Sequence, residues 1–497
     1  MSESPAAVPT PADRVLRRGR DGVVSPPYRV RRPNVLLIMA DQHRHDWMGC
    51  AGLTPLQTPA LDALAAGGVR FTQATCTSPL CAPSRAALAT GLRPPRCHVL
   101  DNSYSLPLDH WTVYQHLRRY GYRTALYGKL DLHKPQFYNG VHGDLPILYH
   151  LGFTDPCETE GKQHAAQRIV IEDEDGRRER LLLGPYQRYL EAKGLLDRFT
   201  ADYALRSRQH AYYAEPSALP AEDFEDAYIG RRACEYLERV NDDAPWFCLA
   251  SFVGPHLPFD APAEYLERYR DVSLPEPLAA GDTPRARFVE EKQRATREGG
   301  ATPERATAMR RNYSGAVTLI DEQIGEMLAV LDRRGLREDT LVIYTSDHGE
   351  MLGDLGIVGK SVQYEPSLRV PLILSGRGVP AGVVSDALVE NHDTTPTLLD
   401  LVGLPVPAGL DARSFAGLLR GETQAHREVQ IAQLPTTQCV RDGRWKAILN
   451  PNDRPELYDL ADDPGEGRNR YAEHPEVYRR LARRLTGEVT GGLDLNG

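Results

Sequence analysis

One short run of this chain has residue types and spacing that could do chemistry: Cys81-Ala82-Pro83-Ser84-Arg85, with Thr90-Gly91 shortly after it. A thiol with a pKa of about 8.5 is an ordinary nucleophile unless a base, a helix N-terminus or a metal lies beside it. The commonest role of a free cysteine is that of a small buried apolar side chain. Five fixed residues together with a Thr-Gly pair are hard to meet by chance, so the run indicates a signal for modification of Cys81.

Three further residues, Asp41, Asp347 and His348, could bind a metal together with Cys81. Hard divalent cations take carboxylate and carbonyl oxygens, and an imidazole joins them when the metal is Mn²⁺ rather than Ca²⁺. An Asp at the end of a strand is by itself more often a turn or helix-cap residue. Because these residues occur in one chain with the Cys81 run, we expect one divalent metal ion, Ca²⁺ or Mn²⁺, with the group made from Cys81 completing the site.

The elements that must position these residues are strand-like apolar runs, each of which ends at a polar cluster. The runs cover residues 34–40, 123–127, 246–253 and 340–345, and the clusters are 41–42, 128–133, 254–259 and 346–350. Continuous apolar runs are typical of strands buried on both faces of a parallel sheet. Ligands bind outside the carboxyl ends of such strands, so the clusters are expected to meet in one crevice.

Helices are predicted between these strands, and the fold class is therefore α/β. Apolar residues at three- and four-residue spacing predict an amphipathic helix over 312–333. Residues 59–66 and 113–120 are further covering helices, and a charged helix is expected at 474–487. The segments 155–225 and 270–310 are more charged and irregular, and we interpret them as insertions over the mouth of the crevice that influence substrate choice.

The 497 residues predict three parts. Residues 1–30 are expected to be a disordered leader, 31–389 the catalytic α/β domain, and 390–497 a smaller C-terminal α+β domain. The formal net charge of −9 argues against a nucleic-acid partner, and no apolar stretch approaches the length of a membrane span. The eight scattered cysteines include no CxxC pair, which predicts reduced thiols in a cytoplasmic enzyme.

Taken together, these pieces resemble a sulfatase of the alkaline phosphatase superfamily over most of residues 33–375. The matching pieces include the run into Asp41, residues 81–91, Gly128-Lys129, residues 255–259, residues 346–350 and Gly359-Lys360. The resemblance implies a large mixed, mostly parallel sheet flanked by helices. It also implies that a formylglycine-generating enzyme oxidises Cys81 to Cα-formylglycine, whose hydrate can attack sulfur or phosphorus.

The same resemblance assigns roles to individual residues. It implies that Asp41, Asp347, His348 and the group made from Cys81 bind the metal. Arg85 and Lys129 would stabilise the aldehyde hydrate and the anion, and His256 and Lys360 would hold the sulfate and protonate the leaving oxygen. Physical chemistry favours these roles, because cations aimed at the sulfate oxygens supply a large part of the catalysis and a positioned acid can protonate the alkoxide.

Two positions depart from the common sulfatase pattern. Gln42 and His348 stand where many members have Asp and Asn, and in this they are similar to choline-sulfatases and phosphonate monoester hydrolases. Two residues after Lys129, many sulfatases have a His, whereas this chain has Asp131 and places its His at 133. Either His133 points into the site from a different turn, or Asp131 recognises a cationic or hydroxyl-bearing substrate.

The leading functional hypothesis is a hydrolase of small-molecule sulfate monoesters. The alternative within enzymes is a phosphonate monoesterase or phosphodiesterase on the same site, since tetrahedral oxyanions of sulfur and phosphorus need nearly the same cationic clamp. A non-catalytic protein that holds an anion is the alternative from another class. The organic part of the ester stays open, and so does the formation of a homo-oligomer.

Overall fold

The computed structural model describes residues 17–18, 24–25, 32–134, 138–206, 208, 214–281 and 283–490. The predicted leader, residues 1–30, lies outside the described residues except for two short strands, β1 (Arg17–Arg18) and β2 (Val24–Ser25).

An eight-stranded sheet forms the centre of the molecule, in the order β13-β4-β12-β11-β3-β10-β6-β7. The bounds of its strands are β3 Asn34–Asp41, β4 Gly68–Phe71, β6 Arg123–Gly128, β7 Asp155–Glu158, β10 Trp246–Pro255, β11 Thr340–Ser346, β12 Leu372–Gly376 and β13 Val383–Ser385. The five strands from β11 to β7 are parallel to one another, whereas β12 is antiparallel to both β11 and β4. The predicted mixed, mostly parallel sheet is thus confirmed.

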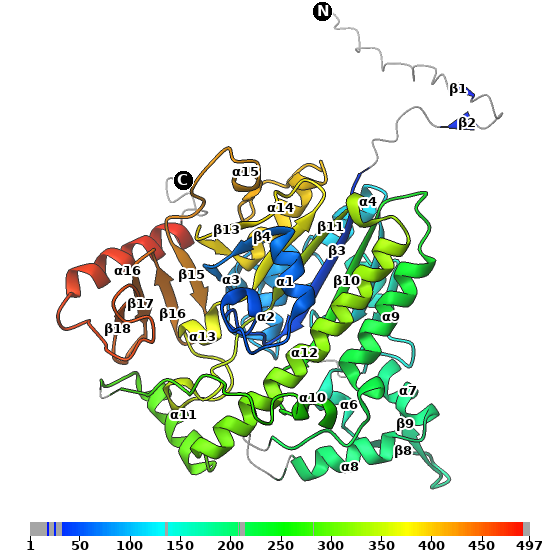
Figure 1. Cartoon of the computed structure of the whole chain (residues 1–497), viewed down its shortest axis with the longest axis horizontal. Coiled ribbons are helices and arrows are strands. Elements are labelled where there is room, and N and C mark those ends of the chain that lie inside the picture. Colours follow the sequence, from blue (N-terminus) through cyan, green and yellow to red (C-terminus); the bar gives the residue numbers. More distant parts are fainter. Residues whose placement is uncertain are drawn as a thin grey trace, which may run out of the picture.

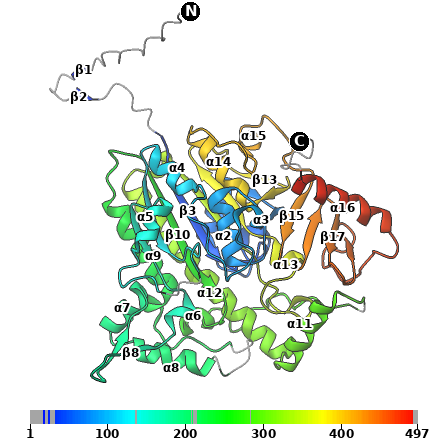
Figure 2. The same cartoon turned by 180° about the vertical axis from the view of Figure 1, so that it is seen from behind.

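Strand β3 is buried on both faces because alternate side chains enter two different cores. Val35, Leu37 and Met39 pack with the helices on one face, and Leu36 and Ile38 pack with those on the other. The first face is covered by α2 (Cys81–Thr90), α4 (Val113–Arg119) and α14 (Thr394–Leu401) (Figure 2). The second face is covered by α1 (Pro59–Ala66), α9 (Glu225–Arg239) and α12 (Pro303–Arg333), which lie in front of the sheet in Figure 1.

Helix α12 begins earlier than the predicted start at residue 312. The Thr302 side chain accepts a hydrogen bond from the backbone N–H of Arg305, and Pro303 occupies the first turn, where its missing N–H costs nothing. These two signals add more than two turns before the apolar repeat begins. Helices α1 and α4 lie where the apolar spacing placed them.

A second sheet of four antiparallel strands lies beside the large one, at the left of Figure 1. Its strands are β15 Gln430–Gln433, β16 Gln438–Arg441, β17 Trp445–Leu449 and β18 Glu456–Asp459. Helix α16 (Pro475–Thr490) covers it with Leu481 and Leu485. Residues between 390 and this sheet, such as Leu398 and Phe415, belong to the core of the large sheet. We therefore propose to begin the smaller domain at β15, later than the predicted boundary at 390.

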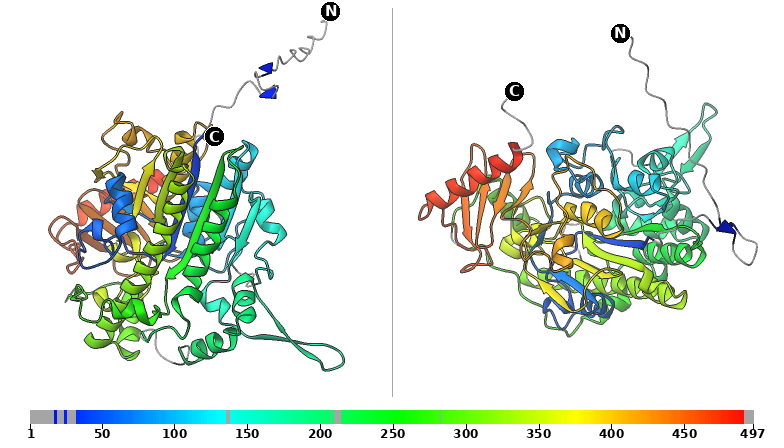
Figure 3. Two further views of the ribbon diagram at one scale, coloured as in Figure 1. Left: turned by 45° about the vertical axis from the view of Figure 1, so that its right-hand side comes forward. Right: turned by 90° about the horizontal axis from the view of Figure 1, so that it is seen from above.

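The predicted insertions contain regular structure. They include β8 (Ile169–Glu172), β9 (Arg178–Leu181), α6 (Lys162–Ala165), α7 (Pro185–Ala192), α8 (Leu196–Arg206) and α11 (Arg287–Glu298). In Figure 1 β3 begins at the top, and these helices lie at the bottom, beyond the carboxyl end of the strand. The hairpin of β8 and β9 projects from the body in the left view of Figure 3. None of the helices in the described part of the chain is long and apolar enough to cross a membrane.

Candidate active site

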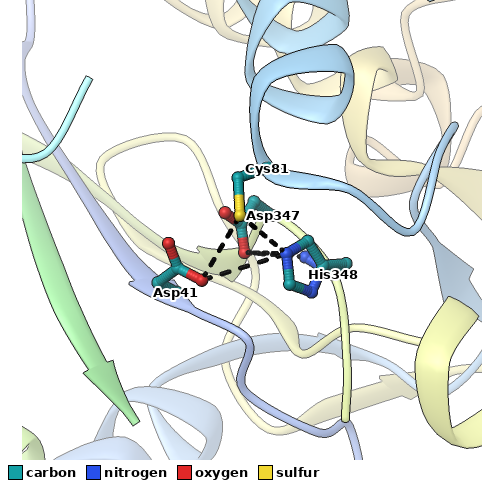
Figure 4. Close-up of side chains that lie close together, drawn as sticks. All are labelled: Asp41, Cys81, Asp347 and His348. Atoms are coloured by element: carbon teal, nitrogen blue, oxygen red, sulfur yellow. Dashed lines mark hydrogen bonds and ion pairs between the residues drawn. The ribbon is translucent and has the colours of Figure 1, made fainter. Parts of the chain in front are cut away.

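Four side chains with metal-binding atoms meet at the carboxyl end of the sheet (Figure 4). Asp41 ends β3, Asp347 and His348 follow β11, and Cys81 is the first residue of α2. Strands β3 and β11 pair in parallel with Ala40 opposite Ser346, so the next residue of each strand brings its carboxylate to the same place. The potential ligand atoms all lie within 4.8 Å of one another. The structure therefore brings together all four residues that were predicted to bind the metal.

The thiol of Cys81 is at the centre of this group. Its Sγ lies 3.2 Å from Nε2 of His348, 3.8 Å from Oδ1 of Asp41 and 3.1 Å from Nζ of Lys360. The residue is buried. Two carboxylates, an imidazole and a fourth donor are a chemically suitable set for a divalent cation, and all of them are shielded from water.

Arg85 lies one helical turn after Cys81 and neutralises both carboxylates. Its Nε donates to Asp347 at 2.8 Å, and one of its terminal nitrogens lies 3.3 Å from Asp41. The other terminal nitrogen donates to the Ser251 hydroxyl at 2.9 Å and to the Lys129 carbonyl at 2.7 Å. One buried guanidinium thus ties α2 to the ends of β3, β6 and β11 and to β10.

Gln42 has a left-handed backbone conformation, and both the oxygen and the nitrogen of its side-chain amide form hydrogen bonds. Its φ of 71° lies in the left-handed region, and its backbone N–H donates to Asp347 at 3.0 Å. Its side-chain oxygen accepts from Nζ of Lys360 at 2.7 Å, and its side-chain nitrogen donates to Glu350. Gln42 therefore holds Lys360 beside Cys81.

Lys129 and His256 complete the surroundings of the thiol. Nζ of Lys129 contacts the Asp41 carboxylate, and it lies 3.1 Å from the Asp131 carboxylate. The Nδ1 atom of His256 is hydrogen bonded to the backbone oxygen of Leu257 at 2.5 Å, and its ring is a hydrogen-bonding neighbour of Cys81.

The electrostatics of the site favour negative charge at the position of the thiol. Burial raises the pKa of Cys81, but Lys129, Lys134 and Lys360 outweigh it and lower that pKa well below its usual value. Burial likewise raises the pKa of Asp41, and the lysines with His256 reverse the effect and lower it. An incoming oxyanion would meet several cations that are already in place, which is the arrangement that stabilises charge most effectively.

The two candidate substrate-binding residues, Asp131 and His133, are placed differently from each other. Nε2 of His133 lies 3.1 Å from the Glu158 carboxylate, and the ring is buried. Asp131 lines a small cavity beside the thiol, together with Lys129 and His256. The structure thus pairs His133 with Glu158, outside the lining of this cavity, and places Asp131 in the lining.

Sequence reasoning missed several residues of this cavity. Lys134 and His164 are among its lining residues. Lys134 follows the polar cluster at 128–133 directly, so the cluster could have been extended by one residue. His164 comes from an insertion and carries no local signal. The Glu350 carboxylate was part of a recognised motif, but its contacts with Gln42 and with the backbone N–H of Gly359 depend on the folded loop.

A mostly parallel α/β sheet with a buried group of potential metal ligands and a cationic pocket around one buried cysteine is typical of a hydrolase that acts on oxyanion esters. The comparisons with known proteins agree. The family model described as Sulfatase matches residues 33–404, and the chain belongs to the sulfatase family. A model described as N-sulphoglucosamine sulphohydrolase, C-terminal, matches residues 353–490. The chain is thus an ester hydrolase of the sulfuric ester class.

Individual relatives cover most of the chain. The choline-sulfatase of Rhizobium meliloti is 30% identical, over 89% of this chain and 83% of its own length. The multifunctional alkaline phosphatase superfamily protein PehA of Trinickia caryophylli is also 30% identical, over 88% of this chain and 91% of its own. Among solved structures, the phosphonate monoester hydrolase of Agrobacterium radiobacter has a TM-score of 0.75 at 26% identity, covering 93% of this chain and 96% of that one.

Proposed function

We propose that the protein hydrolyses sulfate monoesters with a Cα-formylglycine nucleophile made from Cys81 and with the help of one divalent metal ion. The observation that carries the proposal is the position of Cys81. Its sulfur lies between a potential metal ligand, His348 at 3.2 Å, and a cation, Lys360 at 3.1 Å. A hydroxyl of the hydrated aldehyde would supply the nucleophile, and a formylglycine-generating enzyme would be needed to produce it.

Asp41, Asp347 and His348 would hold the metal, with the residue at 81 as a further ligand. When bound, Ca²⁺ or Mn²⁺ would polarise a sulfate oxygen as a Lewis acid. The residues of the chain itself would supply the remaining positive charge. Lys129 and Lys360 flank the thiol and would bind the peripheral sulfate oxygens, and Arg85 would keep the two carboxylates in place.

His256 would act as the acid that protonates the departing alkoxide. Its Nδ1 is already hydrogen bonded to the Leu257 carbonyl, so Nε2 is the nitrogen left to face the substrate. Burial and the nearby Lys360 lower the pKa of His256, whereas Asp41 raises it, so the negative charge of a bound sulfate would be needed to keep the ring protonated for this step. General acid catalysis of this kind contributes roughly 10²- to 10⁴-fold.

The test of the nucleophile is Cys81→Ala combined with mass spectrometry of the peptide that carries residue 81. We expect the wild-type peptide to have lost its sulfur and the variant to lose at least about 10³-fold in kcat/KM. Cys234→Ser is the control, since that thiol is half-buried on α9, across the sheet from α2. Turnover retained by Cys81→Ala would refute the mechanism.

The test of the metal is removal by a chelator. We expect turnover of an aryl sulfate to be lost and then restored by one of Ca²⁺ or Mn²⁺, which would also identify the ion. The unfolding temperature should fall, because a ligand that binds only the folded state stabilises it. Full activity after exhaustive chelation would contradict the proposed metal site.

A second candidate function is phosphonate monoester or phosphodiester hydrolysis on the same site. It is favoured by the structural likeness to the phosphonate monoester hydrolase at a TM-score of 0.75. The Asp41-Gln42 and Asp347-His348 pairs point the same way. Rates on an aryl sulfate and on the matching phosphonate monoester, measured side by side, would decide, and a large preference for the phosphonate would overturn the sulfatase proposal.

We also propose that the enzyme works in a reducing compartment such as the cytoplasm. None of the eight cysteines forms a disulfide in the described structure, which includes all of them, and five besides Cys81 are buried. Buried thiols without a disulfide framework are typical of proteins that meet no oxidising environment.

A further inference from the structure

The cavity beside the Cys81 thiol contains cationic side chains besides Lys129, Lys360 and His256, the residues proposed to bind the sulfate and to protonate the leaving group. These three residues are called the sulfate clamp below. The lining of the cavity includes three lysines, two acidic residues and two histidines: Lys129, Lys134, Lys162, Asp131, Glu160, His164 and His256. Lys162 is already paired with Asp260, which lies outside the lining. Lys129 and His256 belong to the proposed clamp. Lys134 and His164 face the same cavity and have no role in it, and Val253 is the one aliphatic side chain in the lining described.

The Asp131 carboxylate is occupied by two lysines. It lies 2.5 Å from Nζ of Lys134 and 3.1 Å from Nζ of Lys129. These two contacts depress the pKa of Asp131 to about 2, although burial raises it, so the group is an anion whose charge is already shared. A cationic substrate would have to displace an ammonium group to reach it.

Lys134 is held at the cavity by the fold of its loop. Gly128, with a φ of 103°, begins the turn, and Asp131 continues it with a φ of 61°. The backbone N–H of Asp131 donates to Glu158 at 3.3 Å, and His133 pairs with the other oxygen of the same carboxylate. Asp131 accepts from one donor of Lys134, and within the described residues the other two N–H groups of its ammonium have no further hydrogen bond, so they are available to a substrate.

We infer, on the basis of the proposed function, that Lys134 binds a second anionic group on the alcohol part of the substrate. The preferred substrates are then sulfate esters whose alcohol carries a nearby carboxylate, sulfate or phosphate. Esters of cationic alcohols such as choline are disfavoured, because the trimethylammonium group would meet Lys134 while Asp131 is engaged. Lys134 and Asp131 thus set specificity at the side of the cavity that faces the leaving group.

The experiment uses three alkyl sulfates of equal length that differ in charge at the far end. They are choline sulfate, its isostere with a tert-butyl group in place of trimethylammonium, and an analogue that ends in a carboxylate. We expect kcat/KM to rise from the cationic to the neutral to the anionic ester at low ionic strength, and the differences to shrink in salt. Each step should be about fivefold, as for a partly screened charge pair of about 1 kcal/mol.

Variants of Lys134 connect this preference to the residue. Lys134→Met should lower the ratio of kcat/KM for the anionic over the neutral ester about fivefold, and Lys134→Arg should retain it. Differences in leaving-group chemistry cancel in that ratio. Lys193→Met is the matched control, because Lys193 pairs with Asp223 and is absent from the lining of this cavity.

The possible outcomes separate this inference from the proposed function. The inference would be overturned if the enzyme hydrolysed sulfates but preferred choline sulfate. It would also be overturned if Lys134→Met left the ratio of kcat/KM for the anionic over the neutral ester unchanged. Either result would leave the proposed function standing. If no sulfate is hydrolysed, the proposed function fails, and the same charge series made as phosphonate monoesters still measures the preference of the cavity. An anionic preference that depends on Lys134 in that series would support the inference alone.

Discussion

At the scale of the residue, His133 acts on the site through another group. Its buried ring pairs with Glu158, and Glu158 also accepts the backbone N–H of Asp131. Burial lowers the pKa of His133, but the Glu158 carboxylate outweighs burial and raises it above its ordinary value. A protonated His133 therefore stabilises the loop that carries Lys129 and Lys134.

The pH dependence of stability tests this role. A histidine whose pKa is raised on folding adds stability that is complete below its unfolded pKa of about 6.5 and is lost as the pH rises through the folded value. We expect the free energy of unfolding to fall over that window in the wild type and to fall less in His133→Gln, as measured by urea denaturation. His150→Gln, at an exposed histidine, is the control; identical profiles for wild type and His133→Gln would contradict the assignment.

At the scale of the element, the end of β6 depends on a glycine. Gly128 has a φ of 103°, and a Cβ atom there would lie 1.9 Å from the backbone oxygen of Ser251 on the paired strand β10. That oxygen accepts the backbone N–H of Lys129 at 2.9 Å. The close approach of the two strands thus sets the position of Lys129.

A comparison of Gly128→Ala with Gly121→Ala separates the steric clash with the Ser251 oxygen from the free-energy cost of a positive φ. Gly121 has a φ of 90°, but a Cβ atom there meets nothing within 4 Å. We expect Gly121→Ala to cost about 1 kcal/mol of unfolding free energy and Gly128→Ala to cost roughly 3 kcal/mol more, with a large loss of kcat/KM. Denaturation midpoints and rates measure both effects. Equal costs for the two variants would show that the steric contact is relieved by a small shift.

At the scale of the whole molecule, a buried ion network joins the small sheet to the loop that carries Asp347 and His348. Lys446 on β17 is fully buried, contacts Glu466 and lies 3.1 Å from Glu365, the first residue of α13 (Glu365–Leu368). Backbone carbonyls of α13 accept the N–H groups of Gly349 and Glu350. The C-terminal sheet therefore supports one wall of the active site.

Lys446→Met tests this support, since it removes the cation that pairs with the buried Glu466 carboxylate and one of the two close cations, with Arg441, that pair with Glu365. We expect a loss of about 3–5 kcal/mol in unfolding free energy and reduced turnover in the protein that still folds. Arg468→Met is the control in the same domain, because Arg468 pairs with Glu473, both side chains are exposed, and the loss should be at most about 1 kcal/mol. A stable, fully active Lys446→Met variant would show that the two sheets are energetically independent at this contact.

Much of the fold and of the candidate site follows from local features of the sequence. The apolar runs predicted β3, β6, β10 and β11, because a strand buried on both faces needs a continuous apolar segment. The polar residues after those runs, Asp41, Lys129 and Asp347 among them, could be placed at one edge because parallel strands end together. The start of α12 was missed because a Thr-Pro cap outside the apolar repeat decides it.

The sequence by itself determined the sulfatase family and predicted a reacting group at Cys81, since the residues around Cys81 and the strand ends are local signals that need no partner to be recognised. Only the tertiary structure decided how Asp131 and His133 are used. Asp131 lies between two lysines, and His133 turns to Glu158, which lies on a different strand. Such pairings form only when segments that are far apart in the chain come together. Each buried group then pairs with a charged side chain from another segment. No local pattern in the sequence could therefore have predicted them.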